Sequence, residues 1–115
     1  MGHLQVEHIT SQDGKSLVYR LRGVLGESSY SFDFADELRE RLEDGPERII
    51  LDLENLEYIT SSGVGVIAAG YTSATRAGKR FVLCAVPKSV RRVLDICGIL
   101  DVVPCFESEA AALEA

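Results

Sequence analysis

The sequence has 115 residues, 46% of them hydrophobic, with 12 lysines and arginines against 18 aspartates and glutamates and a net charge of −6. We expect one domain over residues 1–115 with enough apolar side chains for a core, which excludes wholesale disorder. The acidic balance excludes a general nucleic-acid binder, and the longest uncharged apolar stretch, residues 63–70, is far shorter than the roughly 20 residues of a membrane-spanning helix.

The cysteines and the first residues of the chain indicate a reducing compartment. Cys84, Cys97 and Cys105 are an odd number without CxxC spacing, so we predict free thiols packed in the core and no disulfide framework. The first residues show no basic segment followed by an apolar one, so we expect no signal peptide. These features predict a cytoplasmic protein without membrane insertion.

The first third of the chain predicts a β-hairpin followed by a helix. Residues 4–9 and 17–24 are predicted strands, and Asp13-Gly14 between them is typical of a tight turn. A helix is expected to begin among the hydroxyls of residues 28–31 and to end at Gly45-Pro46, where a C′ glycine is followed by a proline that cannot continue the helix. The apolar stripe of this helix consists of Phe34, Leu38 and Leu42.

A buried strand and a second helix follow. Residues 48–53 form a continuous apolar run, which is typical of a strand covered on both faces, and a loop is expected after it. The next helix is predicted over about 62–77 and is stopped by Gly78. Its apolar stripe consists of Val64, Ile67, Ala68, Tyr71 and Ala74.

The last third of the chain completes an alternating pattern. It predicts a strand over 81–86, a helix between Pro87 and Gly98, an edge strand over 102–106 and a terminal helix over 107–115. The middle helix is lined by Val90, Val93, Leu94 and Cys97. This order implies right-handed crossovers, and therefore an α/β fold in which a mixed β-sheet (the N-terminal hairpin plus the crossover strands) packs with about four helices.

Three consecutive hydroxyl residues, Thr60, Ser61 and Ser62, stand where the second predicted helix begins, and Gly63 and Gly65 follow them. A helix N-terminus has unpaired N–H groups and a partial positive charge, so a serine there can carry a phosphate without unfolding the helix. The alternative is simple capping, in which the Ser61 or Ser62 hydroxyl accepts an N–H two or three residues on. The glycines either keep the backbone bare for a partner or serve helix packing.

Catalytic and metal-binding patterns are not found. Gly63-Val64-Gly65 lacks the third glycine of a dinucleotide fingerprint, and Gly14-Lys15-Ser16 lacks the first glycine of a phosphate-binding loop. His3 and His8 lie in the first predicted strand, where a surface or packing role is expected, and the cysteines lack zinc spacing. We therefore predict no enzyme, no cofactor and no metal site.

The charged residues are unevenly distributed. Residues 27–57 carry eleven acidic and three basic side chains, whereas residues 76–92 carry six basic and no acidic ones. Two faces of opposite sign would steer the domain toward a charged protein partner. The alternative is that these are solvated faces of two different helices.

At the hydroxyl segment the sequence resembles the STAS-domain family, and within it the bacterial anti-sigma-factor antagonists. The resemblance covers nearly the whole chain: its most specific part lies in residues 58–67, and it also includes 49–53, 78–83 and 90–99. In that family the unphosphorylated antagonist binds a serine-kinase anti-sigma factor, which frees a sigma factor. The kinase phosphorylates one serine at a helix start, and a PP2C-type phosphatase reverses the step.

The resemblance places the phosphorylated serine at Ser61 and a partner-binding surface at Thr60, Ser61, Ser62, Gly63 and Gly65. Many relatives have Asp where this chain has Thr60, which leaves Thr60 and Ser62 open as alternative acceptors. A different class remains open too: a non-enzymatic STAS scaffold subunit of a lipid- or anion-transport complex. The serine-type acceptor favours the antagonist.

Overall fold

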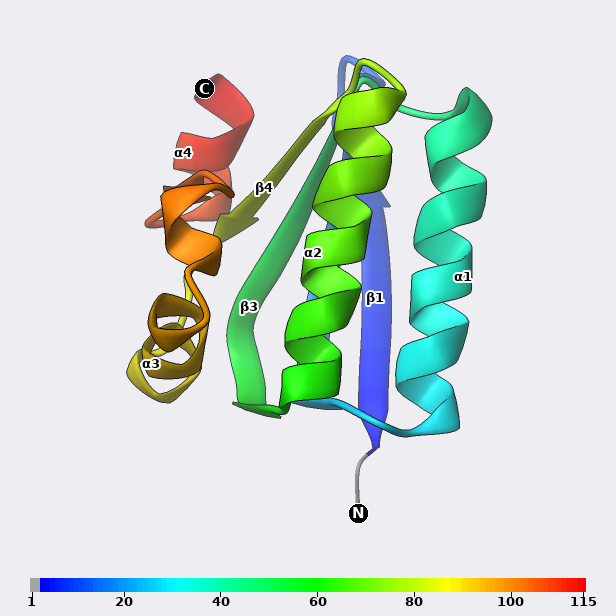
Figure 1. The fold of residues 1–115 in the computed structure, drawn as a ribbon. Helices are drawn as coiled ribbons and strands as arrows, with labels where there is room; N and C mark the ends of the chain where they lie inside the picture. Colours follow the sequence, from blue (N-terminus) through cyan, green and yellow to red (C-terminus); the bar gives the residue numbers. More distant parts are fainter. Residues whose placement is uncertain (1–2) are drawn as a thin grey trace.

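A five-stranded mixed sheet forms the centre of the fold (Figure 1). The structure is a computed structural model that describes residues 3–115, and its strands lie in chain order. They are β1 (Leu4–Thr10), β2 (Ser16–Leu25), β3 (Arg48–Ile59), β4 (Arg80–Cys84) and β5 (Cys105–Phe106). β1 and β2 are antiparallel, whereas each later strand runs parallel to the strand before it.

Four helices and one 3-10 helix accompany the sheet in the described part of the chain. They are α1 (Ser29–Asp44), α2 (Ser61–Arg76), α3 (Lys88–Ile96), the 3-10 helix Ile99–Asp101 and α4 (Glu109–Glu114). α1 and α2 cover one face of the sheet side by side, with their N-termini at the same end, whereas α4 packs on the other face (Figure 1). The arrangement confirms the predicted α/β fold with a hairpin, crossovers and four helices.

Turn chemistry fixes the hairpin. Gly14 has a φ of 74°, a left-handed conformation that favours glycine. The Asp13 carboxylate accepts the Ser11 hydroxyl at 2.6 Å and the Lys15 N–H at 3.0 Å, which closes the turn. The predicted hairpin is confirmed, and β1 pairs with β2 along its whole length.

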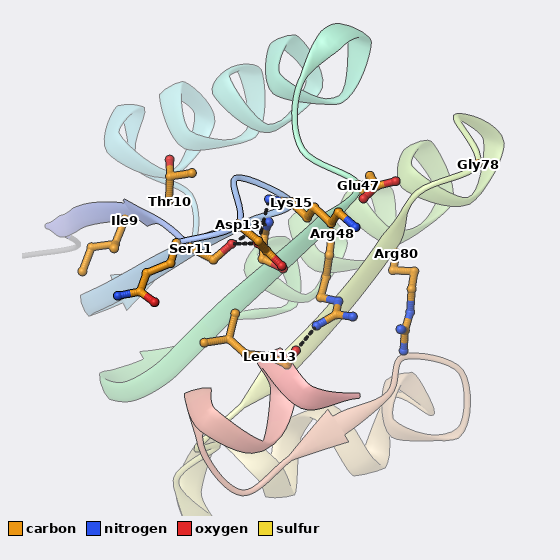
Figure 2. A pocket seen from close by; sticks show the side chains of 12 residues that line it. Ile9, Thr10, Ser11, Asp13, Lys15, Glu47, Arg48, Gly78, Arg80 and Leu113 are labelled. Atoms are coloured by element: carbon orange, nitrogen blue, oxygen red, sulfur yellow. Dashed lines mark hydrogen bonds between the residues drawn. The ribbon is translucent and has the colours of Figure 1, made fainter.

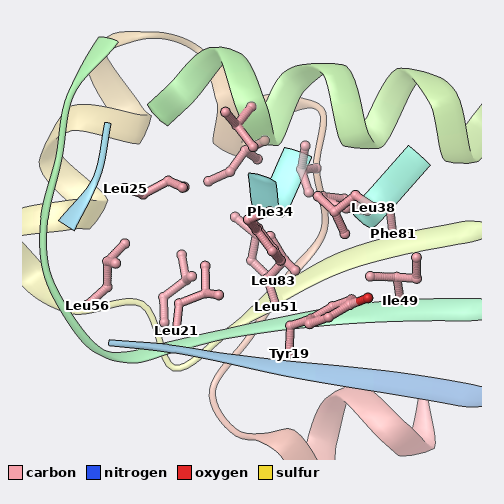
Figure 3. Close-up of a cluster of buried hydrophobic side chains, with 14 of the residues drawn as sticks. Tyr19, Leu21, Leu25, Phe34, Leu38, Ile49, Leu51, Leu56, Phe81 and Leu83 are labelled. Carbon is pink, nitrogen blue, oxygen red and sulfur yellow. The ribbon is translucent and has the colours of Figure 1, made fainter. Parts of the chain in front are cut away.

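The main core lies between the sheet and the helices α1 and α2 (Figure 3). Tyr19 is fully buried in it, packs edge-on against Phe34 at 5.2 Å between ring centroids, and donates its hydroxyl to Glu37 at 2.9 Å. Burial and the Glu37 carboxylate raise the pKa of Tyr19 well above its usual range. The buried polar end of the ring is thereby satisfied, so the aromatic side chain can fill the core.

The stripe predicted for α2 is confirmed, since its members Val64, Ile67, Ala68, Tyr71 and Ala74 are buried or half-buried. Gly70 lets the helix approach the sheet closely, because an added Cβ would lie 2.9 Å from the Phe81 ring. Val66 is buried as well, although it lies outside the stripe. The reason is that α2 packs on α1 as well as on the sheet, which widens its buried face.

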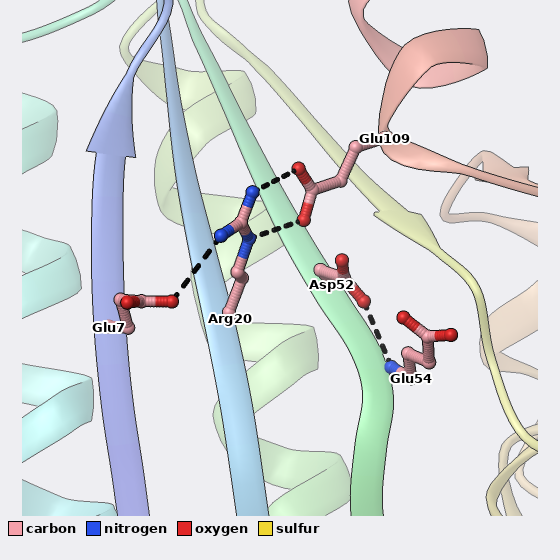
Figure 4. Close-up of polar contacts among 5 residues, drawn as sticks. All are labelled: Glu7, Arg20, Asp52, Glu54 and Glu109. Carbon is pink, nitrogen blue, oxygen red and sulfur yellow. Dashed lines mark hydrogen bonds and ion pairs between the residues drawn. The ribbon is translucent and has the colours of Figure 1, made fainter.

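α4 covers part of the second face and is held at both ends by arginines. Ala112 is fully buried against a small second cluster on β2, β3 and β4. At the start of α4, Arg20 donates to both carboxylate oxygens of Glu109, at 2.7 and 2.9 Å (Figure 4). At its end, Arg48 donates to the carbonyls of Ala112 and Leu113 at 2.8 and 2.7 Å, which complements the free carbonyls of a helix C-terminus.

A buried carboxyl lies beside this contact (Figure 4). Asp52 on β3 is 8% exposed and accepts the Glu54 N–H at 2.9 Å. Burial, together with the neighbouring Glu109 carboxylate, raises the pKa of Asp52 to about 6. The hydrogen bonds from Arg20 hold the pKa of Glu109 well below its usual range. At mildly acidic pH the pair therefore carries one negative charge, located on Glu109.

The prediction of a loop between residue 53 and α2 is wrong. β3 continues past residue 53 to Ile59, because its second half pairs with the end of β2 through Leu56 opposite Gly23 and Ile59 opposite Leu25. Register shifts interrupt this pairing, so the side chains of residues 54–59 do not alternate regularly between the faces. Only Thr60 therefore separates the end of β3 from the start of α2.

Other differences are confined to element ends. Gly45 ends α1 as predicted. The strand expected over 81–86 ends at Cys84, and the one expected over 102–106 is reduced to Cys105–Phe106. Of the cysteines, Cys84 is buried as predicted, Cys105 is half-buried, and Cys97 is exposed because it lies just past the last turn of α3.

The burial of Ile67 gives a test of the core. Ile67 is 0% exposed, so Ile67→Ala should lower the free energy of unfolding by about 2–5 kcal/mol. Ile96→Ala is the matched control, since Ile96 is 80% exposed and its loss should change stability by no more than about 0.5 kcal/mol. Urea unfolding of the two variants measures both values, and equal losses would contradict the packing described for α2.

The carboxyl pair predicts how stability depends on pH. The folded-state pKa of Asp52 lies above its ordinary value of 3.8, so its stabilising contribution is complete below that value and is lost as the pH rises through about 6. Glu109 has the opposite sign, because its lowered pKa adds stability that is lost only in strong acid.

Asp52→Asn should therefore remove most of the decline in stability between about pH 4 and 7. Thermal unfolding of the parent and the variant across this range checks the prediction. Asp95→Asn, which removes an exposed carboxyl on α3, is the control and should leave the pH profile unchanged. Parallel profiles for the parent and Asp52→Asn would contradict the assignment.

Candidate functional site

The hydroxyl segment lies where β3 passes into α2. Thr60 has an extended backbone, and its Oγ1 accepts the Gly63 N–H at 3.2 Å, while its carbonyl accepts the Val64 N–H at 2.9 Å. Thr60 is thus the N-cap of α2. The expectation that Ser61 or Ser62 caps the helix is wrong, because α2 begins one residue earlier than predicted, at Ser61.

Ser61 is therefore left free of a structural role. It is the first residue of α2, its side chain is exposed, and its hydroxyl makes no hydrogen bond to the described residues 3–115. Ser62 is half-buried. Of the three hydroxyls predicted as candidates, Ser61 is the one that is both solvent-exposed and not used by the fold.

The glycines of the segment have different roles. Gly63 is buried, and an added Cβ would lie 2.2 Å from the Leu25 carbonyl oxygen and 2.8 Å from Cγ1 of Ile59. The bare backbone of Gly63 is thus explained by packing. Gly65 is exposed, and nothing lies within 4 Å of an added Cβ there. The interpretation that a glycine keeps this surface open to a partner consequently rests on Gly65.

The turn between β2 and α1 lies against this helix start. The Leu25 carbonyl accepts the Thr60 N–H at 3.1 Å, and an added Cβ on Gly26 would lie 3.0 Å from Thr60 Oγ1. Ser61 and this turn therefore belong to one end of the molecule, where both α1 and α2 begin (Figure 1).

The arrangement favours a phosphoacceptor over a nucleophile. Ser61 stands at the positive end of the dipole of a 16-residue helix, where a phosphate dianion is stabilised. A catalytic serine would need a base within hydrogen-bond reach, and no histidine or carboxylate of the described residues bonds to Ser61. Ser61 thus lacks the base that a catalytic serine needs, and an anion at this position would be stabilised by the helix start.

A large surface hollow lies at the opposite end of the sheet (Figure 2). It measures about 830 Å³ and is bordered by the β1–β2 turn, the starts of β3 and β4, and Leu113 of α4. Its arginines are already engaged, since Arg48 and Arg80 both donate to the main-chain oxygen of Ala115. None of the residues predicted for the site lines it.

The basic segment does not form a single face. Arg76 ends α2 and Arg80 begins β4, at the end of the sheet away from Ser61, whereas Lys88, Arg91 and Arg92 lie on or begin α3. This division agrees with the alternative of solvated side chains on different elements. In residues 3–115 no three histidine, cysteine or acidic side chains gather as a metal-binding group, and no helix is long and apolar enough to cross a bilayer.

Two features near the site or the sheet are not predicted from the sequence. The first is the contact of the buried Ser31 hydroxyl with Gly26, for which only the cap-like spacing of Ser28 and Ser31 gives a signal. The second is the pairing of Asp52 with Glu109, which are distant in sequence. No sequence pattern indicates this second contact.

Comparison with known proteins identifies the family. The family model "STAS domain" matches residues 5–112. A protein from Paenibacillus polymyxa named "Anti-sigma F factor antagonist" is 31% identical over 102 residues, covering 84% of this chain and 83% of the relative.

Solved structures share the fold. The unphosphorylated form of the anti-sigma factor antagonist SpoIIAA has a TM-score of 0.79 at 23% identity, covering 97% of this chain and 94% of that one. The phosphorylated form from Bacillus has a TM-score of 0.73 at 21% identity and covers 97% of each chain. A sulfate transporter family protein from Wolinella succinogenes has a TM-score of 0.73 at 20% identity, covering 92% of this chain and 86% of that one. Because the family model matches nearly the full length of the chain and the solved structures share its fold, the chain belongs to the STAS-domain family.

Proposed function

We propose that this protein is an anti-sigma factor antagonist whose binding is switched by phosphorylation of Ser61. The observation that carries the proposal is the exposed hydroxyl of Ser61 at the first position of α2, where the fold does not use it. Family membership and the name of the Paenibacillus relative support the antagonist role.

The unphosphorylated protein binds a serine-kinase anti-sigma factor in the cytoplasm and so frees a sigma factor. The binding surface consists of Thr60, Ser61, Ser62 and Gly65, together with the exposed part of the loop after β2, which begins at Glu27. Gly63 contributes indirectly, because its missing side chain lets the turn lie against the helix start. The domain itself performs no catalysis in this scheme.

Phosphorylation transfers the γ-phosphoryl group of ATP to Ser61. A bond forms between Ser61 Oγ and phosphorus, the bond from that phosphorus to the bridging oxygen breaks, ADP leaves, and the hydroxyl proton passes to a base of the kinase. A PP2C-type phosphatase restores the hydroxyl by hydrolysis with release of inorganic phosphate. The acceptor side of the reaction requires only that Ser61 be accessible.

The added charge explains the release of the partner. A phosphoserine carries roughly −1.5 to −2 charges at neutral pH, in place of a neutral hydroxyl in the interface. An electrostatic mismatch of about 3 kcal/mol would weaken binding about a hundredfold. The helix itself tolerates the change, since its N-terminus favours an anion by roughly 0.3–1 kcal/mol.

A scaffold subunit in a transport complex is the second candidate, because the same fold occurs in a sulfate transporter family protein. The free hydroxyl at the start of α2 favours the antagonist, since a passive scaffold has no need of it. Retention of a small kinase-like ATPase by the purified domain would support the antagonist, whereas retention of membrane transport subunits would support the scaffold.

Phosphorylation at Ser61 is directly testable. After incubation with the kinase and ATP, phosphopeptide mass spectrometry should locate the phosphate on Ser61, and the modified domain should melt no lower than the parent. Ser61→Ala should bind the kinase but resist labelling, and Ser61→Asp should bind about tenfold or more weakly, since a carboxylate supplies only part of the phosphate charge.

Thr60→Ser and Ser62→Ala serve as controls, since both leave Ser61 in place. Phosphate found on Thr60 or Ser62 and not on Ser61 would move the site by one residue and keep the mechanism. Kinase binding without any label would exclude the switch.

A substitution at Gly65 should change the stability of the domain and its affinity for the partner in opposite directions. Gly65→Gln should raise the free energy of unfolding by about 0.5–1 kcal/mol, because glutamine is the better helix former and an added Cβ meets open space. The same change should weaken partner binding, because its side chain occupies the surface beside Ser61. Gly63→Ala is the contrasting variant and should destabilise the domain, since its Cβ would collide with the Leu25 carbonyl. Calorimetric titration with the partner decides the matter, and unchanged affinity for Gly65→Gln would place Gly65 outside the interface.

A further inference from the structure

A buried serine connects the starts of α1 and α2. Ser31 lies in the first turn of α1 and is 0% exposed. Its Oγ accepts the N–H of Gly26 at 2.9 Å and the hydroxyl of Ser28 at 3.3 Å, while its own N–H donates to Ser28 Oγ at 3.2 Å. The Ser31 side chain thus bonds to the turn that precedes its own helix.

The same turn is fixed from its other side by α2. The Leu25 carbonyl accepts the Thr60 N–H at 3.1 Å, and the Gly63 backbone packs so closely on that carbonyl that a Cβ there would lie 2.2 Å from it. Gly26 is buried, and an added Cβ there would lie 3.0 Å from Thr60 Oγ1, so the Thr60 side chain would have to shift to accept it. The two-residue segment Leu25–Gly26 is thereby held between the Ser31 hydroxyl and two residues of the α2 start, Thr60 and Gly63.

We propose that Ser31 is a positioning residue for Ser61: through the Leu25–Gly26 turn, its hydroxyl sets where the start of α2 presents Ser61 to the kinase. This inference rests on the proposed function. Ser31→Ala removes the hydroxyl and leaves the buried Gly26 N–H without its acceptor, which costs free energy unless the turn moves to find another. Since Leu25 and Thr60 are hydrogen-bonded, a shift of the turn changes the N-cap of α2 as well.

The effect should fall on the chemical step. Phosphoryl transfer requires the acceptor oxygen in line with the γ-phosphoryl group, and a displacement of about 1 Å can reduce such a rate about a hundredfold. Ser31 is buried and does not contact the kinase, so initial binding should change little. Ser31→Ala should therefore lower kcat for phosphorylation of Ser61 by about 10- to 100-fold and change KM by less than about threefold.

Two control variants separate positioning from a general loss of stability. Ser28→Ala removes the N-cap of α1 but keeps the bond between Gly26 and Ser31, and Ser108→Ala removes the N-cap of α4, which lies on the other face of the sheet. Each loses one helix cap, and both should retain the parent kcat at a temperature where all variants are folded. Ser31→Cys, with a weaker acceptor of similar size, should give an intermediate value and replaces Ser31→Ala if that variant does not fold.

Amide NMR supplies a readout that does not depend on the kinase. Ser31→Ala should shift the Gly26 and Thr60 amide signals and speed their hydrogen exchange, whereas Ser108→Ala should leave both unchanged. If the parent is not labelled on Ser61, the proposed function fails and the role of Ser31 fails with it. If the parent is labelled and folded Ser31→Ala is labelled with the same kcat, or if Ser108→Ala is slowed equally, the positioning role alone is wrong.

Discussion

The hydrogen bond from the Thr60 N–H to the Leu25 carbonyl is the contact on which the arrangement of this end of the molecule depends. It extends the parallel pairing of β2 and β3, whose last partners are Leu25 and Ile59, into the first residue beyond the sheet. The segments that follow β2 and β3 then leave the sheet at the same level, so α1 and α2 start side by side (Figure 1). In open α/β sheets the carboxyl ends of parallel strands are where binding sites form, and Ser61 lies at this edge.

Much of the fold could be predicted because its signals are local. Asp13-Gly14 specifies the hairpin turn within a few residues, and the spacing of Phe34, Leu38 and Leu42 indicates the buried side of α1 without knowledge of what covers it. The second half of β3 has no such signal. Its exposed side chains are mostly polar, its register against β2 shifts twice, and its partner strand is some thirty residues away. Only the assembled sheet therefore shows that these residues form a strand.

The site likewise combines features that local sequence signals predict with features that only the assembled fold determines. Three adjacent hydroxyls before an apolar stripe locate a helix start, but the choice of cap depends on where β3 ends, and a change of one residue transfers the role from Ser61 to Thr60. The part played by Ser31 is beyond sequence reasoning for another reason. The spacing of Ser28 and Ser31 indicates a cap, yet the acceptor role toward Gly26 follows from the path of the turn in three dimensions. Asp52 and Glu109 meet only because α4 docks on the sheet.

The capping of α2 by Thr60 divides two tasks between neighbouring side chains. Thr60 begins the helix, and Ser61 is left free to carry a chemical mark. In the proposed switch the two forms of the domain share one conformation and differ by a phosphate ester. Because such an ester hydrolyses extremely slowly without an enzyme, the phosphorylated form would not revert spontaneously. Under this proposal the domain would store a single binary state, and the lifetime of the phosphate would be set by the activities of the opposing kinase and phosphatase. Position 61 is also open to selection for signalling alone, whereas positions 60 and 63 are constrained by the fold itself.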